Sequence, residues 1–213
     1  MDKKIYWDIL DQKRSEILPL LSNFKDDFYL AGGTALALQL GHRDSIDFDF
    51  FSTNSFSTEE LFYKIKRIFT GHQIVKVQEA KDTLTLIIDQ SIKLSFFGYQ
   101  YELMKPLIDE NFLKMASIED IACMKMSAII SRSVLKDYVD LYFIFHQFKL
   151  ATLLNLTNKK FPAIDSNLVL KSLVYFEDIE KEPIIFKHNQ EVSFELIKKY
   201  LLETVKKYLD KNR

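Results

Sequence analysis

The 213-residue sequence predicts an α+β fold, with a mixed sheet and flanking helices in the first half and helices alone in the second. Up to about residue 100, short apolar runs alternate with turn residues, which is typical of strands joined by tight turns. After Pro106, apolar residues recur at three- and four-residue spacing, which is typical of amphipathic helices. Because no flexible linker separates the halves, we expect a core of residues 1–105 and a helical domain of residues 106–213 that pack together.

The first half is predicted to alternate helices and strands. Apolar spacing favours an amphipathic helix over Tyr6–Phe24, and Pro19 is a point at which this helix kinks or splits. A second helix begins at Ser57 and ends near Phe69. Short apolar or alternating runs predict five strands, at residues 28–31, 46–51, 74–77, 83–88 and 92–97.

Glycine and polar residues mark the turns of this half. The first strand ends in Gly32-Gly33, which indicates a tight turn. The run TALALQL that follows predicts a short helix, with Thr34 as its N-cap and Gly41 as its stop. Residues 89–91 are expected to join the last two strands as a hairpin.

Helix caps organise the second half. The run at residues 117–120, Ser-Ile-Glu-Asp, resembles a capping box and predicts a helix that extends to about Ser131. A second helix is expected from Val134 to Phe148. Another begins at Asp165, and Ser193 caps the last.

Composition excludes several classes of protein. No apolar run is long enough to span a membrane, and the N-terminus lacks the apolar core of a signal peptide. The single cysteine, Cys123, excludes a disulfide framework and a cysteine-built zinc site. We therefore expect a cytoplasmic protein with no membrane partner. The net charge of −1 argues against a surface that is basic throughout, while a local basic groove for nucleic acid stays open.

The strand at 46–51 carries the most informative chemistry. Successive side chains of a strand point to opposite faces, so Asp47 and Asp49 share one face while Phe48 and Phe50 point to the core. Two close carboxylates repel each other, by about 1 kcal/mol in water and about 4 kcal/mol in a shielded cleft. Such a pair is explained by a cation, and carboxylate and phosphate oxygens together suit Mg²⁺. Taken alone, the Asp-x-Asp pattern is usually that of a solvated strand face.

The surrounding residues make the pattern more specific. Gly32-Gly33 at a helix start offers backbone N–H groups to a phosphate, and Arg43 can neutralise a phosphate through two hydrogen bonds. The strand, the two glycines, the helix and the Asp-x-Asp strand follow one another within a short stretch. The four histidines are too widely spaced for a ligand set, although His42 is close enough to Arg43 to touch a substrate.

The run AGGTALALQLGHRDSIDFDFF at residues 31–51 resembles the AbiEii/AbiGii-type nucleotidyltransferases. These are the toxins of type IV toxin–antitoxin, or abortive phage infection, systems. A second similar block covers residues 117–142, from the capping box through Lys125 and Arg132 to the run KDYVDLY, and residues 171–178 look like the family's C-terminal helical signature. The resemblance implies the nucleotidyltransferase fold that DNA polymerase β also has, with a mixed sheet, flanking helices and a helical C-terminal half.

The resemblance also implies roles for individual residues. Asp47 and Asp49 would hold Mg²⁺, and Lys125 would reach the phosphates of the nucleotide. Asp137 or Asp140 would complete the site, as a base or as an organiser of Lys125 and Arg132. The candidate nucleotide-binding residues are Gly32, Gly33, Thr34, Arg43, Ser45 and Arg132.

One position departs from the pattern. A third carboxylate in this fold usually comes from a neighbouring strand, in a pattern such as Lys-Val-Asp-Phe. The corresponding stretch here is Lys93-Leu94-Ser95-Phe96, so Ser95 stands where an acid is expected. Asp89, in the predicted hairpin turn, is too far along the strand to replace it.

These features predict an Mg²⁺-dependent nucleotidyltransferase. It would transfer a nucleoside monophosphate from a nucleoside triphosphate to an RNA, such as the 3′ end of a tRNA, or to a protein hydroxyl, with pyrophosphate leaving. The resemblance implies a toxin that a separately encoded antitoxin neutralises. The alternative, motivated by Ser95, is a non-catalytic nucleotide-binding or interaction module on the same fold.

Overall fold

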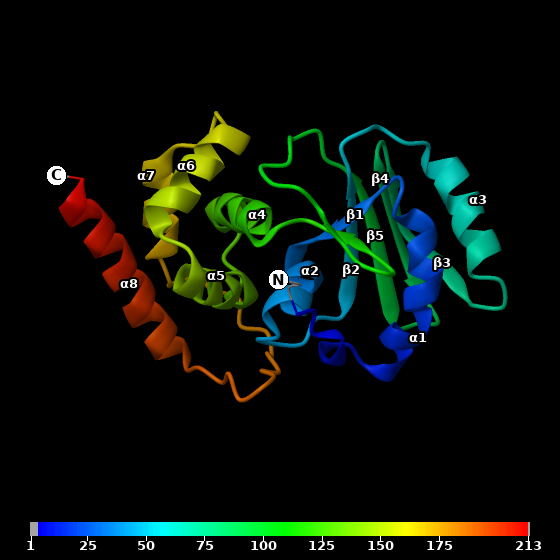
Figure 1. Cartoon of the computed structure of the whole chain (residues 1–213), viewed down its shortest axis with the longest axis horizontal. Coiled ribbons are helices and arrows are strands. Elements are labelled where there is room, and N and C mark those ends of the chain that lie inside the picture. Colours follow the sequence, from blue (N-terminus) through cyan, green and yellow to red (C-terminus); the bar gives the residue numbers. More distant parts are fainter. Residues whose placement is uncertain (1–3, 213) are drawn as a thin grey trace.

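A seven-stranded mixed sheet organises the first part of the chain (Figure 1). The computed structural model describes residues 4–212. The strand order is β3-β4-β5-β2-β1-β7-β6, in which β2 runs parallel to β5, β1 runs parallel to β7, and the other neighbours are antiparallel. The strands are β1 (Tyr29–Ala31), β2 (Asp47–Ser52), β3 (Ile74–Ala80), β4 (Thr83–Ile88), β5 (Ile92–Gly98), β6 (Ile108–Asp109) and β7 (Lys114–Met115).

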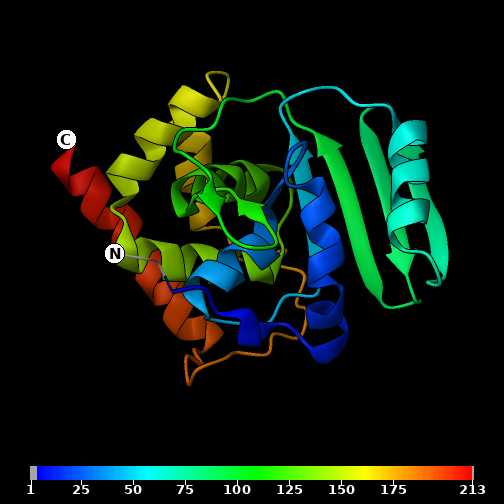
Figure 2. The ribbon, with the colours of Figure 1, turned by 45° about the vertical axis from the view of Figure 1, so that its right-hand side comes forward.

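Helices cover both faces of this sheet (Figures 1 and 2). On one face lie α1 (Gln12–Leu21) and α3 (Thr58–Ile68), and on the other lie α2 (Gly32–Leu40) and α4 (Ile118–Ser131). The alternation of β2 divides its side chains between these layers, because Phe48 and Phe50 are buried while Asp47 and Asp49 are only half-buried. Phe50 stacks on Phe96 of β5 with ring centroids 5.1 Å apart.

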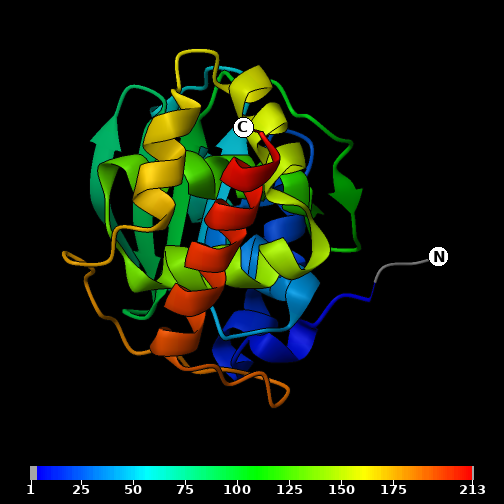
Figure 3. The same ribbon diagram turned by 90° about the vertical axis from the view of Figure 1, so that its left-hand side faces the viewer.

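The rest of the chain is helical. In it, α5 (Leu135–Gln147), α6 (Leu150–Lys160) and α7 (Ser166–Leu173) pack against α4, and α8 (Phe194–Lys211) packs against these three helices. Figure 3 shows α8 lying across the outer side of this group. No helix within residues 4–212 is both long enough and apolar enough to cross a membrane.

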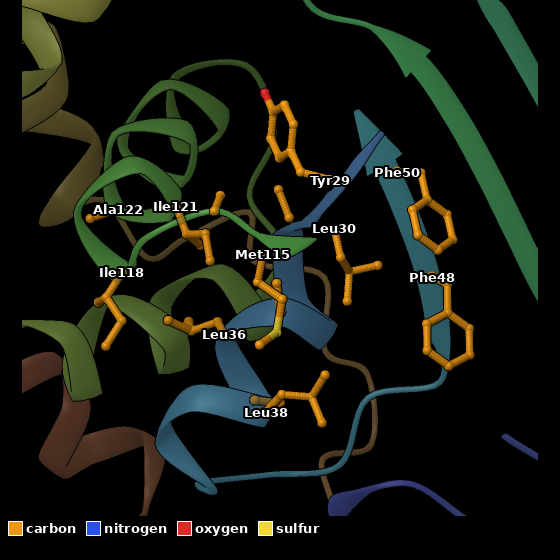
Figure 4. Packing of buried hydrophobic residues seen from close by; sticks show 14 of the residues in the cluster. Tyr29, Leu30, Leu36, Leu38, Phe48, Phe50, Met115, Ile118, Ile121 and Ala122 are labelled. Carbon is orange, nitrogen blue, oxygen red and sulfur yellow. The ribbon is translucent and has the colours of Figure 1, made fainter. Parts of the chain in front are cut away.

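The sheet and the helices share one hydrophobic core (Figure 4). Leu36 of α2 lies between Leu30 of β1 and the α4 residues Ile118 and Ile121 in this view, and all four side chains are buried. The α+β class is therefore confirmed. The sheet continues past residue 105 into β6 and β7, so the proposed division at that point crosses the sheet.

Several predicted elements are confirmed, including the hairpin at residues 89–91, where Asp89 and Gln90 have positive φ angles. The predicted helix over Tyr6–Phe24 is instead two short 3₁₀ turns, at Trp7–Ile9 and Ser22–Phe24, with α1 between them. The break comes at Asp11, whose side chain accepts a hydrogen bond from the backbone N–H of Arg14 and begins α1. Pro19 does not split the helix.

Other expectations need correction. The predicted N-cap role of Thr34 is wrong, because α2 begins at Gly32 with Ala31 in the N-cap position. Residues 171–178 are helical only as far as Leu173. The prediction also named no element for α6, β6 or β7; each of the last two has only two residues, too few to show a period.

Candidate active site

The register of β2 and β5 brings the predicted acids to one place. Asp47 lies opposite Lys93 and Asp49 opposite Ser95, so these four side chains share one face of the sheet, toward Gly33 of α2 and Lys125 of α4. Lys93 Nζ lies 3.4 Å from Asp47 Oδ2. Burial raises the pKa of Asp49, and the neighbouring charge of Asp47 raises it further. The pair therefore has the electrostatic strain that a bound cation would relieve.

The start of α2 lies directly beside Asp49. Gly32 has a φ of +70°, and a side chain there would begin 3.3 Å from Asp49 Oδ2. A Cβ at Gly33 would lie 2.8 Å from Arg43 Nη2, closer than real contacts allow. Ala31, in the N-cap position, has no side-chain acceptor for the first N–H groups of the helix. The two glycines thus leave the backbone at the helix start accessible next to the acid pair.

The hydroxyl of Thr34 is used internally. It donates to the backbone carbonyl of Asp47, and it lies 2.7 Å from Ser45 Oγ. Thr34 is buried, whereas Ser45 is half-buried and lines the cleft. These contacts hold the start of α2 against the start of β2.

A buried carboxylate, Asp140, links the two parts of the molecule. Its Oδ1 lies 2.8 Å from His42 Nε2 and 2.8 Å from Arg43 Nε, while its Oδ2 lies 2.8 Å from Arg43 Nη2 and 2.7 Å from Lys125 Nζ. Burial by itself would raise the pKa of Asp140, but Arg43 and Lys125 outweigh it and hold that pKa well below its ordinary value. His42 is fully buried, so the expectation that it touches substrate is wrong.

Asp137 completes the network on the other side of Lys125. Lys125 Nζ lies 2.6 Å from Asp137 Oδ1, and Arg132 Nε donates to Asp137 Oδ2 at 2.9 Å. The Asp137 side chain is 1% exposed, whereas that of Arg132 is 58% exposed. Because Asp137 and Asp140 are both buried and paired with cations, the geometry supports the organising role rather than the base role.

A cleft between the sheet and α4 brings these groups together. Two adjoining cavities of about 670 and 420 Å³ share lining residues from β2, β5, α2 and α4. The shared residues are Gly33, Asp49, Lys93, Lys125 and Arg132. The smaller cavity also has Asp47, Arg43 and Ser45 in its wall, so the predicted site residues other than the buried Thr34 and Asp140 surround one space.

Ser95 departs from the family pattern as expected, and Asp89 does not replace the missing acid. Ser95 is in register with Asp49 on the neighbouring strand, so a hydroxyl lies where the pattern leads us to expect an acid. Asp89, in the hairpin, has its Oδ2 2.6 Å from Nδ1 of His72, and neither residue lines the cleft.

The sequence prediction missed Lys93 as a site residue. Its signal was available, because Lys93 is two positions before Ser95 and must share its strand face. It also missed the segment before α8, where Glu182 and Ile185 line the smaller cavity and the N–H of Asp44 donates to the carbonyl of Ile185. No periodic pattern in the sequence predicts that hydrogen bond.

Comparisons with known proteins agree with this geometry. A family model described as "Nucleotidyl transferase AbiEii toxin, Type IV TA system" matches residues 19–206. The chain is 40% identical over 194 residues to the uncharacterized protein aq_aa25 of Aquifex aeolicus, covering 87% of this chain and 89% of that protein.

Solved structures show the same fold at low identity. The nucleotidyltransferase toxin MenT4 (Rv2826c) of Mycobacterium tuberculosis H37Rv has a TM-score of 0.64 and 14% identity, covering 91% of this chain and 80% of that one. JHP933 of Helicobacter pylori has a TM-score of 0.60 and 18% identity, covering 98% and 96%. The family match over most of the chain carries the assignment: this protein belongs to the AbiEii family of nucleotidyltransferase toxins of type IV toxin–antitoxin systems.

Proposed function

We propose that this chain transfers a nucleoside monophosphate from a nucleoside triphosphate to an acceptor hydroxyl, using Mg²⁺ held by Asp47 and Asp49. The single observation that carries the proposal is the cleft in which the acid pair, the open start of α2 and Lys125 surround one space. Positioning and charge neutralisation are the main requirements of such phosphoryl chemistry.

The residues present fit a divalent cation. The two carboxylates lie on one strand face, and the raised pKa of Asp49 reflects burial and the charge of Asp47. Mg²⁺ is commonly bound by one or two carboxylates together with substrate phosphates. When bound, the ion would supply positive charge to the triphosphate oxygens.

The chain's own residues have distinct tasks in this proposal. The N–H groups at Gly32 and Gly33 bind phosphate oxygens at the helix start. Lys125, fixed between Asp137 and Asp140, presents a positive charge to the phosphates. Arg132, whose side chain is 58% exposed, can contact the substrate with the N–H groups that Asp137 does not use.

Arg43 and Thr34 have more limited roles in nucleotide binding. Arg43 has its Nε and one Nη2 hydrogen bond committed to Asp140, so its proposed part in nucleotide binding is chiefly to shape the wall beside Gly33. Thr34 likewise acts through Ser45, because its hydroxyl donates to β2 rather than into the cleft.

We favour an RNA acceptor, such as a tRNA 3′ end, over a protein hydroxyl. Lys93, Arg132 and Lys136 are partly exposed in the cleft, among carboxylates that balance their charge, and these three cations can contact RNA phosphates. A separately encoded antitoxin is the expected partner, as the family membership implies.

A transfer assay tests the proposal. The purified chain is incubated with each labelled nucleoside triphosphate, Mg²⁺ and total RNA or total protein, beside the Asp49→Asn variant. We expect label on RNA with the natural chain and a loss of at least about a hundredfold with the variant, because a key metal-binding charge is gone.

The Asp210→Asn variant is the matched control, since Asp210 is an exposed acid on α8, outside the residues that line the cleft. It should label RNA at the natural rate. Equal labelling by the natural chain and Asp49→Asn, or no labelling of any acceptor, would count against the enzyme and favour the non-catalytic module.

A further inference from the structure

The two acids of β2 each end a row of side chains that crosses β4 and β5. One row runs from Ile87 of β4 through Lys93 to Asp47, and the next runs from Thr85 through Ser95 to Asp49. The strand beside the acids therefore contributes an ammonium and a hydroxyl. Neither group is an anionic ligand for a second metal ion.

Three further carboxylates, those of Asp44, Asp137 and Glu182, line the smaller cavity, but within residues 4–212 none of them forms a metal-binding cluster with the pair. Glu182 is paired with Lys136 at 2.6 Å. On the β1 side, Asp49 is opposite Ala31 and next to Gly32, and from α4 the nearest charged group is Lys125. Asp137 and Asp140 are buried and committed to cations. Over residues 4–212 there is no cluster of three or more His, Cys, Asp or Glu side chains suited to a metal ion.

Charge favours one cation rather than two at this pair. One divalent ion balances the two carboxylates. A second would have to approach Asp47 beside the Lys93 ammonium, which lies 3.4 Å from Asp47 Oδ2. At a given distance, the repulsion between that ammonium and a divalent ion is twice the repulsion between two unit charges.

We propose that the site binds a single divalent cation, and that the Lys93 ammonium occupies the place of a second one beside Asp47. The inference rests on the proposed function and deepens it. Lys93 is a positioning residue here: it neutralises and orients Asp47, and Ser95 leaves the other side of the pair without a bridging acid.

Mn²⁺ bound to the intact chain provides a readout independent of activity. Two Mn²⁺ ions in one site lie about 3.5–4 Å apart and couple magnetically, whereas a lone ion gives the spectrum of an isolated centre. The probe is Mn²⁺ with a nucleoside triphosphate whose α–β bridge is a methylene group, titrated to saturation and followed by electron paramagnetic resonance.

The natural chain is expected to bind one uncoupled Mn²⁺. The Lys93→Met/Ser95→Asp variant, which removes the ammonium and adds an acid, is expected to bind two coupled ions. Lys93→Met alone, a smaller change, should bind its single ion several-fold more tightly because no ammonium competes for Asp47. Lys76→Met is the control, since Lys76 Nζ lies 4.3 Å from the ring centre of Phe62 on α3 and Lys76 does not line the cleft.

Each contrary result has its own meaning. A coupled pair in the natural chain overturns this inference and leaves the proposed function in place. A single ion in the double variant, with Lys93→Met unchanged in affinity, shows that Lys93 and Ser95 do not set the number of ions and also overturns it. If the natural chain binds no Mn²⁺, the metal assignment of the proposed function falls, and this inference falls with it.

Discussion

Asp140 is the residue on which the site's charged groups depend. It accepts hydrogen bonds from His42 and Arg43 of the first half and pairs with Lys125 of α4, all without exposure to solvent. Breaking a buried ion pair by removing one partner is strongly destabilising, because the remaining charge is left without compensation. The same contacts fix Lys125 at the edge of the cleft.

The Asp140→Asn variant should be less stable than the natural chain by about 3–5 kcal/mol at pH 7. The pKa of Asp140 is lowered on folding, so its stabilising contribution is present above the ordinary carboxyl pKa and is lost as the pH falls toward the folded value. The difference between the two chains should therefore shrink below about pH 4. Urea unfolding at several pH values measures it.

Asp210→Asn, at an exposed acid, should match the natural chain within about 0.5 kcal/mol at every pH. If Asp140→Asn were as stable as this control at pH 7, the charged network would have no structural importance.

The sequence predicts the position of a side chain correctly where the local backbone geometry determines that position. The alternation of β2 is enough to place Asp47 and Asp49 on one face. By contrast, Asp140 pairs with His42 across 98 positions of sequence, and no local pattern encodes that distance. Its burial, and with it the choice between base and organiser, follows only from tertiary packing.

At the level of elements, the start of α2 would form the phosphate side of the cleft in the proposed function. Gly32 lies close to the Asp49 carboxylate and Gly33 lies close to the Arg43 guanidinium. A side chain at either glycine would therefore displace the neighbouring group. Gly33 has an ordinary φ, so its constraint is space alone, while Gly32 is also limited by its positive φ.

The Gly33→Ala variant should bind nucleoside triphosphate at least about tenfold more weakly, a change of about 1.4 kcal/mol. Its methyl group would displace the Arg43 guanidinium and cover the backbone N–H groups. Titration calorimetry with a non-hydrolysable analogue, well below the melting temperature, measures the affinity.

The Gly71→Ala variant is the control that distinguishes a loss of nucleotide binding from a loss of stability. Gly71 has a φ of +89° and open space around it, so the substitution strains the backbone without filling the cleft. It should lower the melting temperature and leave the affinity unchanged. Equal affinity of Gly33→Ala and the natural chain would contradict the phosphate role of this helix start.

Elements with caps or clear periods were predictable. Ser117 and Ser193 begin α4 and α8 through hydrogen bonds from Asp120 and Leu196 backbone N–H groups, as their sequences indicate. The pairing of β7 with β1 was not predictable, because Leu30 and Met115 meet through the global path of the chain.

At the scale of the whole molecule, the sheet and the helices form one unit. A single hydrophobic core includes residues of both parts, and Asp140 ties the loop after α2 to α5. The segment before α8 returns to the first half, where the N–H of Lys187 donates to the carbonyl of His42.

The chain should therefore unfold in one cooperative transition. We expect the calorimetric and van't Hoff enthalpies of unfolding to agree within about 10–15% in differential scanning calorimetry. Two resolved transitions would show that residues 1–105 and 106–213 unfold separately, in spite of their shared core.

The uncapped beginning of α2 links substrate supply to the persistence of the protein. Ala31 offers no acceptor to the helix's first N–H groups, so in the proposed function a bound triphosphate would act as the missing cap. By mass action, a ligand at a hundred times its dissociation constant adds about 2.7 kcal/mol to folding. The toxin's resistance to proteolysis should therefore rise and fall with the cellular nucleotide concentration.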